Sequence, residues 1–336
     1  MYNKFLKIFS FLFLLLFISI SSSNAQVKED KEENSLNKQG SSYPPRLFGA
    51  DFYSQAGLSF GYDSNVNLSP DRKGDLFEEA LYSLQMEKPL FESQTFILNY
   101  DLDALTYNEI TDASSILNHF RFTLDTKSPV CSFGFGYDLG ILYYPYGRNG
   151  NFLFHRGFLY LRKEISPNTY HMLTAEYGIK EYTYRKALSD SISTFQNKER
   201  LDRRESLSYG INSSLTDRLF AQAGVKFSVN DSNAKYLSFY DYKTYELFLS
   251  AFYQLSENLI LSPELGYRKK IYDSRTVTNG NYKQKDALYS AGIGLIYKLN
   301  DKDRFSLDYI YRNNSSNDSF SRYLESVMSC SWKRSF

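Results

Sequence analysis

The chain has 336 residues, of which 39 are Lys or Arg and 38 are Asp or Glu, so its formal net charge is +1. Nucleic-acid-binding proteins usually carry a basic excess, and this balance argues against one. Two cysteines are too few for a disulfide framework. No stretch beyond the N-terminal region contains 18 consecutive apolar residues, so no helical membrane span is expected.

The first 25 residues have the layout of a secretory signal peptide. Lys4 and Lys7 precede an apolar stretch at residues 8–18, and small residues then lead to Ala25. A basic start, a short apolar stretch and small residues before the cut are typical of such a signal. The stretch is shorter than the roughly 20 residues that a membrane anchor needs. We therefore predict cleavage after Ala25.

Residues 26–48 are rich in Lys, Glu, Asn and Ser and include Pro44 and Pro45. A segment of this composition cannot bury enough apolar surface to fold alone. It is predicted to be a disordered periplasmic linker. The alternative is a plug, or a peptide that folds on a partner.

From residue 49 to residue 336, one pattern repeats. Apolar residues alternate with polar or small ones, which is the period of a strand with two different faces. Between residues 221 and 230, Ala, Val and Phe occupy the odd positions and Gln, Gly, Lys, Ser and Asn the even ones. The predicted strands are residues 50–63, 77–88, 95–107, 116–126, 131–145, 152–165, 169–184, 203–215, 218–230, 241–255, 258–272, 285–299, 304–313 and 321–336.

These strands, read together with the composition, predict a membrane barrel. The chain contains 30 Tyr and 27 Phe, yet its mean hydropathy is −0.45. That combination suits a barrel with an apolar, aromatic outer face and a polar inner face. Short turns such as 166–168 alternate with longer loops such as 64–76 and 185–202, as in outer-membrane proteins with periplasmic turns and outer loops.

The predicted fold is therefore all-β: a closed antiparallel up-and-down transmembrane β-barrel of about fourteen strands. It is expected in the outer membrane of a Gram-negative cell, with both termini on the periplasmic side. A soluble β-sandwich or propeller is the alternative. Strands long enough to cross a bilayer at a tilt, about 9–11 residues, argue against it.

The C-terminus adds a second indication. Trp332 and Phe336 fall on one face of the last predicted strand, and this ending resembles the closing strand of outer-membrane proteins. The resemblance implies recognition by the barrel-insertion machinery, which is an expected partner alongside the lipids of the outer membrane.

The inner face is predicted to carry charges of both signs in similar numbers. Such a lining would be hydrated, with no strong bias toward cations or anions. Ion pairs that merely pack a narrow lumen are the alternative. The predicted lumen-lining residues are Glu79, Asp101, Asp103, Arg121, Asp125, Asp138, Arg156, Arg162, Glu176, Lys180, Lys226, Glu246, Glu264, Arg268, Asp308 and Arg312, and the pattern places Glu87 and Lys270 on the same face.

Catalytic signals are few. His119 is predicted to point inward near Asp101 and Asp103, and a His–Asp pair at a barrel rim could activate water as a base. His155 and His171 fall on the outward face. A rim hydrolase is therefore kept only as an alternative to a non-enzymatic barrel. No metal-ligand spacing or phosphate-binding loop is present in the sequence, so no metal or cofactor is expected.

One short motif resembles a known family. Residues 61–67 read GYDSNVN at the end of the first barrel strand, and this string is similar to the barrels of the surface lipoprotein assembly modifier family. The resemblance implies about fourteen strands and a role in delivering lipoproteins to the cell surface. Residues 26–48 are too short to form the helical-repeat domain that precedes such barrels, so a separate periplasmic partner would have to supply it. Asp63, Asn65 and Asn67 are expected to shape the first outer loop.

The function predicted from these features is a hydrated conduit for solute or polymer passage. A protein-handling barrel that assists delivery of lipoproteins or other partners to the cell surface is one alternative. A structural or adhesive barrel with a plugged lumen is the other. No catalytic residues are assigned.

Overall fold

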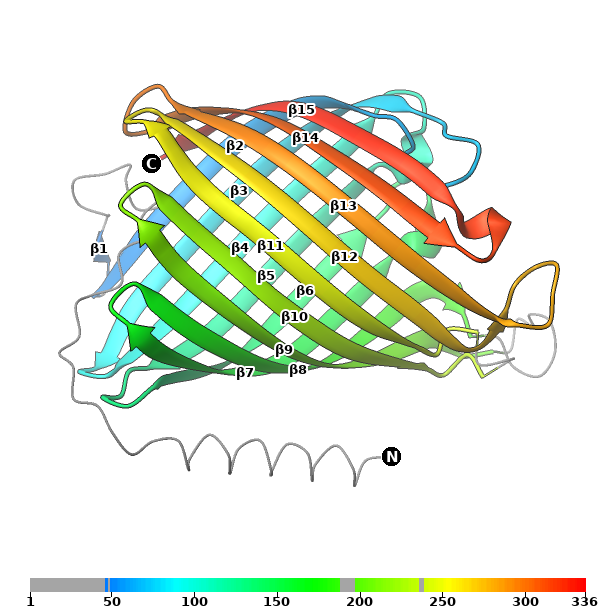
Figure 1. The fold of residues 1–336 in the computed structure, drawn as a ribbon, viewed down its shortest axis with the longest axis horizontal. Coiled ribbons are helices and arrows are strands. Elements are labelled where there is room, and N and C mark those ends of the chain that lie inside the picture. Colours follow the sequence, from blue (N-terminus) through cyan, green and yellow to red (C-terminus); the bar gives the residue numbers. More distant parts are fainter. Residues whose placement is uncertain (1–45, 48, 188–196, 236–238) are drawn as a thin grey trace.

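The computed structural model describes residues 46–47, 49–187, 197–235 and 239–336. Fourteen antiparallel strands form one sheet, and β15 hydrogen-bonds back to β2, so the sheet closes into a barrel (Figure 1). The predicted closed antiparallel barrel is confirmed, including its strand number. The strands are β2 (Ala50–Asp63), β3 (Asp75–Phe91), β4 (Gln94–Tyr107), β5 (Ser115–Thr126), β6 (Ser132–Tyr143), β7 (Phe152–Ser166), β8 (Thr169–Lys186), β9 (Glu199–Thr216), β10 (Leu219–Ser232), β11 (Tyr242–Ser256), β12 (Leu259–Thr276), β13 (Lys283–Lys298), β14 (Asp303–Ser316) and β15 (Tyr323–Ser335).

Most predicted strand boundaries agree with the structure within three residues. The two largest differences are at β9, which begins at Glu199, and at β12, which ends at Thr276; each strand extends four residues beyond its prediction. The loop predicted at 185–202 is correspondingly shorter. Its residues 188–196 lie outside the described residues.

Some outer loops contain short helical turns that the alternation pattern did not predict. They are η1 (Thr111–Ala113), η2 (Arg148–Gly150) and η4 (Ser319–Ser321). In the part of the chain that the structure describes, no helix combines the length and the apolar character needed to cross a membrane.

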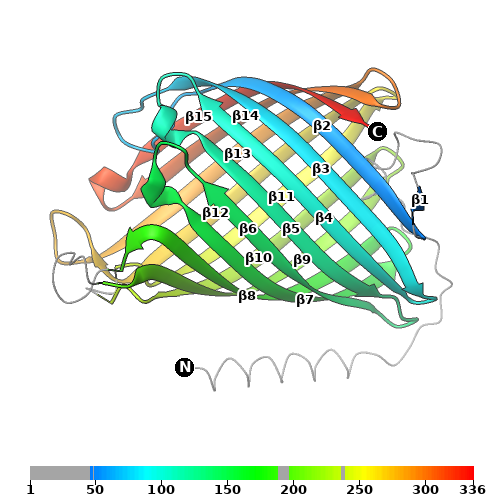
Figure 2. The ribbon, with the colours of Figure 1, turned by 180° about the vertical axis from the view of Figure 1, so that it is seen from behind.

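The two ends of the barrel differ. Short connections such as 92–93 and 167–168 gather at one end, and longer ones such as 64–74 and 277–282 at the other (Figure 2). We call these the short-turn end and the long-loop end. The C-terminus lies at the short-turn end (Figures 1 and 2).

The predicted linker lies mainly outside the described residues, as does the predicted signal peptide. Its described residues Arg46–Leu47 form β1, which pairs with the first residues of β2. The last part of the segment 26–48 therefore forms a tight antiparallel pair with the first barrel strand.

The first outer loop is fixed to the seam where the barrel closes. Asn65 is fully buried, and its side-chain amide donates hydrogen bonds to the backbone oxygens of Ser69 and Leu324, each at 2.8 Å. Asp63 accepts a hydrogen bond from the backbone N–H of Asn65 at 2.8 Å. These two motif residues shape the loop by side chain–backbone bonds, whereas Asn67 is exposed.

The two faces of the sheet have opposite character. Outward-facing side chains such as Leu247, Leu265 and Tyr289 are large, apolar and at least half exposed. The largest fully buried side chains are all polar, and they include Thr244 and Asp138. A soluble sandwich would bury its apolar face instead. This barrel has its apolar side chains outside, as a protein surrounded by lipid requires.

Several inward-facing aromatic rings pack directly over glycines of neighbouring strands. Phe158 covers Gly136, and Tyr160 covers Gly134. A β-carbon at either glycine would overlap the ring, and at Gly136 it would also overlap the carbonyl oxygen of Phe122. The glycines therefore allow large rings to pack against the inner wall without widening the sheet.

Gly136→Ala is expected to lower the free energy of unfolding by about 1–3 kcal/mol, because the added methyl group overlaps backbone that must shift. Gly157→Ala is the matched control, since no neighbouring atom lies within 4 Å of the point that a β-carbon would occupy there. Urea unfolding in lipid vesicles measures both variants. Equal midpoints for the two would contradict the packing argument.

Candidate channel wall

The strand register places the sixteen predicted lumen-lining residues on one face of the sheet. Arg121 lies opposite Asp138, which in turn lies opposite Arg156. Lys226 lies opposite Glu246 on the next strand. The full set on this face is Glu79, Asp101, Asp103, Arg121, Asp125, Asp138, Arg156, Arg162, Glu176, Lys180, Lys226, Glu246, Glu264, Arg268, Asp308 and Arg312, together with Glu87 and Lys270.

Asp138 is the centre of an ion-pair network on this face. Its side chain has no solvent exposure. Arg121 Nε donates to Asp138 Oδ1 at 2.7 Å, and Arg156 Nε donates to Asp138 Oδ2 at 2.6 Å. Charge-assisted hydrogen bonds of this kind are stronger than neutral ones, so the buried carboxylate fixes the positions of both guanidinium groups.

The network continues around the barrel to β10. Arg156 donates to Glu176 Oε1 at 3.2 Å, and Lys226 Nζ lies 2.5 Å from Glu176 Oε2. The last contact passes over β9, which lies between β8 and β10. Side chains can span an intervening strand in this way because the inner face of a barrel is concave. Charges from five strands, β5 to β8 and β10, are thereby cross-linked.

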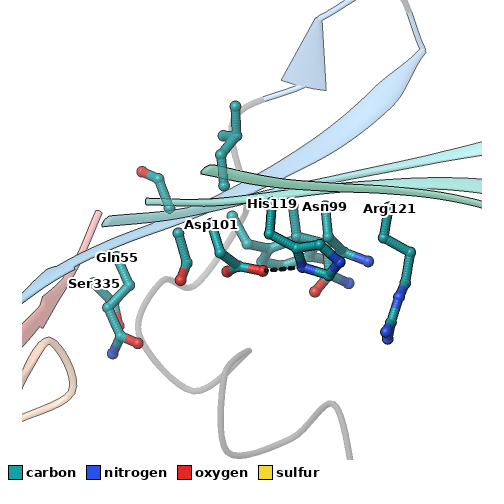
Figure 3. Close-up of a pocket in the computed structure, with 11 residues that line it drawn as sticks. Gln55, Asn99, Asp101, His119, Arg121 and Ser335 are labelled. Carbon is teal, nitrogen blue, oxygen red and sulfur yellow. Dashed lines mark ion pairs between the residues drawn. The ribbon is translucent and has the colours of Figure 1, made fainter. Parts of the chain in front are cut away.

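His119 lies between two carboxylates. Its Nδ1 is 3.7 Å from Asp101 Oδ2 (Figure 3), and its Nε2 is 3.6 Å from Asp138 Oδ1. Both distances exceed a normal hydrogen bond, and Asp138 is already held by two arginines. Asp103, the second predicted neighbour, lies opposite Leu117 instead. The ring therefore bridges an ion-pair network rather than forming an isolated His–Asp pair.

A polar cavity of about 350 Å³ opens beside this histidine. Gln55, Asn99, Asp101 and His119 line it, and Arg121 extends farther from the wall than the other labelled side chains (Figure 3). Within the described residues, no group of three or more His, Cys, Asp or Glu side chains could hold a metal ion.

His155 and His171 are on the outward face. Each has a tyrosine partner on a neighbouring strand, Tyr137 and Tyr209 respectively. Their place is therefore among the aromatic side chains that face outward, away from the charged wall.

Charge is unevenly distributed around the inner wall. The inward positions of β2, β3 and β4 carry no Lys or Arg. The acidic wall, as we call it, comprises Asp51, Asp63, Asp75, Glu79, Glu87, Asp101 and Asp103.

The inward positions of β7 to β12 carry more bases than acids. Because β10 is seven strands from β3 in a ring of fourteen, these strands face the acidic wall. Their inward bases are Arg156, Arg162, Lys180, Arg200, Arg204, Lys226, Arg268 and Lys270, against the acids Glu164, Glu176, Asp202, Glu246 and Glu264.

The sequence predicted a lining with no strong bias toward cations or anions, and the distribution of charge around the wall refines this prediction. The two signs are similar in number over the whole wall, but they are segregated across the diameter. Charges separated in this way create a transverse field, which is strongest in a narrow, low-dielectric enclosure.

The sequence pattern misplaces one inward base and omits another from the predicted lining. It puts Arg200 in the loop at 185–202, whereas β9 carries this residue. Arg204 lies within the predicted strand 203–215 but is not among the predicted lumen-lining residues. Arg200, Asp202 and Arg204 continue the inward positions of β9 without a break, but the outward Arg203 is also polar, so the alternation of hydropathy does not reveal this part of the strand.

No protein-family model matches the sequence, and no curated protein matches it significantly. Solved structures do resemble the fold. The outer-membrane channel DcaP of Acinetobacter baumannii is 10% identical, with 88% of this chain and 100% of that chain covered and a TM-score of 0.53. OmpT of Vibrio cholerae, an outer-membrane protein, is 9% identical, with 87% and 100% covered and a TM-score of 0.49. At 10% identity the likeness to DcaP is one of fold: this chain has the architecture of an outer-membrane β-barrel.

Proposed function

We propose that this chain is a porin-like channel of the Gram-negative outer membrane that conducts small polar solutes. The main support for the proposal is that charged side chains on the enclosed face of the sheet remain accessible to solvent. Asp101 keeps 50% of its side-chain surface exposed and Arg121 keeps 41%. Charges buried in a dry interior are very costly, so side chains this accessible imply water beside them.

The character of the wall favours polar solutes over apolar ones. An apolar solute would displace water from charged groups such as Asp101 and Arg121 without replacing its hydrogen bonds, which costs free energy. A polar or charged solute can replace those bonds. The sixteen inward residues that the sequence predicted are assigned, on this proposal, to the lining of the solute path.

The outer-membrane location rests on three supports. The outward face is apolar, the N-terminal sequence has the pattern of an export signal with cleavage near Ala25, and the fold is shared with outer-membrane barrels. Trp332 and Phe336 both lie on the outward face at the short-turn end. We assign them the role of an insertion signal for the barrel-assembly machinery.

The test is single-channel recording in planar lipid bilayers. The refolded protein is expected to produce discrete conductance steps, and a boiled sample of the same preparation should produce none. Heat-modifiable migration on a gel serves as the folding control, because a folded barrel migrates differently before and after boiling. A preparation that shows the gel shift but no conductance steps would refute the channel.

Two other functions predict a folded barrel that gives no conductance steps. A barrel that delivers lipoproteins, the role implied by the motif at 61–67, would need its periplasmic partner and would not conduct by itself. A plugged structural or adhesive barrel would not conduct either. In the structure, Asp63 and Asn65 of the motif hold the first outer loop to the closing seam, which is a structural task in any of these functions.

A further inference from the structure

The long-loop end of the basic side carries cations that rest on aromatic rings. Lys180 Nζ lies 3.6 Å from the ring centre of Phe152 and 4.7 Å from that of Tyr182. Lys270 Nζ lies 4.6 Å from the ring centre of Tyr242. A cation over a ring face is held electrostatically.

Two arginines extend the same arrangement. Arg275 lies 4.1 Å from the ring centre of Phe239 and 5.0 Å from that of Tyr272. Arg204 donates to the hydroxyl of Tyr242 at 3.2 Å. We call the set of Lys180, Arg204, Lys270 and Arg275, together with Phe152, Tyr182, Phe239, Tyr242 and Tyr272, the basic–aromatic face.

The four cations of this face differ from Arg200, which pairs with Asp202 at 2.5 Å. Among the described residues, none of the four has an Asp or Glu oxygen within 4 Å. A ring orients a cation without neutralising it, because the ring carries no net charge. Nitrogen donors held in this way remain able to bind an anion.

Acidic residues lie among these cations: the strand register puts Asp202 opposite Lys180 and Asp286 opposite Lys270. Lys180 and Lys270 each also lie within electrostatic range of Arg204, so the four cations and these two acids together form one region of net positive charge. The region extends from β8 to β12, which are four strand spacings apart, or roughly 19 Å along the wall. A single small anion cannot contact both ends of such an array, whereas an extended solute with several carboxylates can.

We propose that the basic–aromatic face binds an elongated solute with several carboxylates, of the acidic-oligosaccharide class, at the long-loop entrance of the channel. The cations recognise the carboxylates, and the tyrosine hydroxyls provide partners for sugar hydroxyls. The proposal rests on the proposed channel function, since it names the solute class that enters this barrel.

Calorimetry of the full-length protein in detergent tests the proposal, with trigalacturonate as the probe. Arg204→Gln combined with Lys270→Gln is expected to weaken binding at least tenfold. Arg203→Gln combined with Lys269→Gln is the matched control, because these neighbours point outward and are exposed. The control should remain within twofold of the unaltered protein. Maltotriose, which has no charge, should bind at least tenfold more weakly than trigalacturonate.

Three outcomes overturn the proposal: no detectable binding, equal weakening by the inward and outward double variants, or citrate binding as tightly as trigalacturonate. The last would indicate a site for small anions. Conductance is recorded on the same preparations. Binding without conductance would refute the channel but support the face as a ligand site, whereas conductance without binding would refute only the face.

Discussion

Asp138→Asn is expected to lower the free energy of unfolding by about 3 kcal/mol, since removing one member of a buried ion pair typically costs about 3–5 kcal/mol. The Asp138 carboxylate has no exposure and forms ion pairs with both Arg121 and Arg156. Asparagine keeps the shape but leaves two guanidinium groups without this anion. The lower end of the range applies because Arg121 is 41% exposed and can gain water, and because Arg156 retains Glu176.

The measurement is urea unfolding of the protein in lipid vesicles, followed by the fluorescence of Trp332, the only tryptophan of the chain. Asp217→Asn is the control, because Asp217 is exposed in a short turn and loss of a surface charge should change stability little. Equal unfolding curves for the two variants would show that the network around Asp138 contributes no measurable stability.

The sequence predicted the strands well because one face of each strand meets lipid and the other meets water, so apolar and polar residues alternate with a period of two. That signal weakens at the long-loop end. Residues 199–203 belong to β9, yet the outward Arg203 is polar and exposed there, so apolar residues no longer alternate with polar ones. The hydrogen-bonded ladder continues where both faces are polar. Hydropathy cannot detect that part of a strand.

Individual side-chain partners required the register, which the sequence alone leaves undetermined. Asp138 and His119 were both assigned inward positions, but their proximity depends on how β5 and β6 align. The contacts between cations and aromatic rings depend, in addition, on side-chain rotamers. The acidic wall was predictable from the sequence, because β2 to β4 are consecutive in sequence and therefore adjacent in the barrel. Counting the inward acids and bases over all strands together hid it, because the excess of acids on β2 to β4 is offset by bases on other strands.

Neutralising the acidic wall is expected to make the channel about threefold more permeable to chloride relative to potassium. The change combines Glu79→Gln with Asp101→Asn, two inward carboxylates on neighbouring strands. A unit charge about 10 Å from a permeating ion contributes about 0.4 kcal/mol in water, and 0.1 M salt reduces this to roughly 0.15 kcal/mol. Two charges acting oppositely on the two ions therefore change the permeability ratio by about 0.6 kcal/mol, or roughly threefold.

Reversal potentials in a KCl gradient measure this ratio. Glu78→Gln combined with Asp217→Asn is the matched control, since both residues are exposed and neither faces the lumen; it should leave the ratio unchanged. Neutralising Arg204 and Lys270 on the opposite wall should move the ratio in the opposite direction. Because the field is screened by salt, both shifts should grow when the recording solution is diluted to about 0.01 M. Shifts of the same sign from the two walls would show that permeating ions do not experience the segregated charges, and the conduction path would then have to lie away from them.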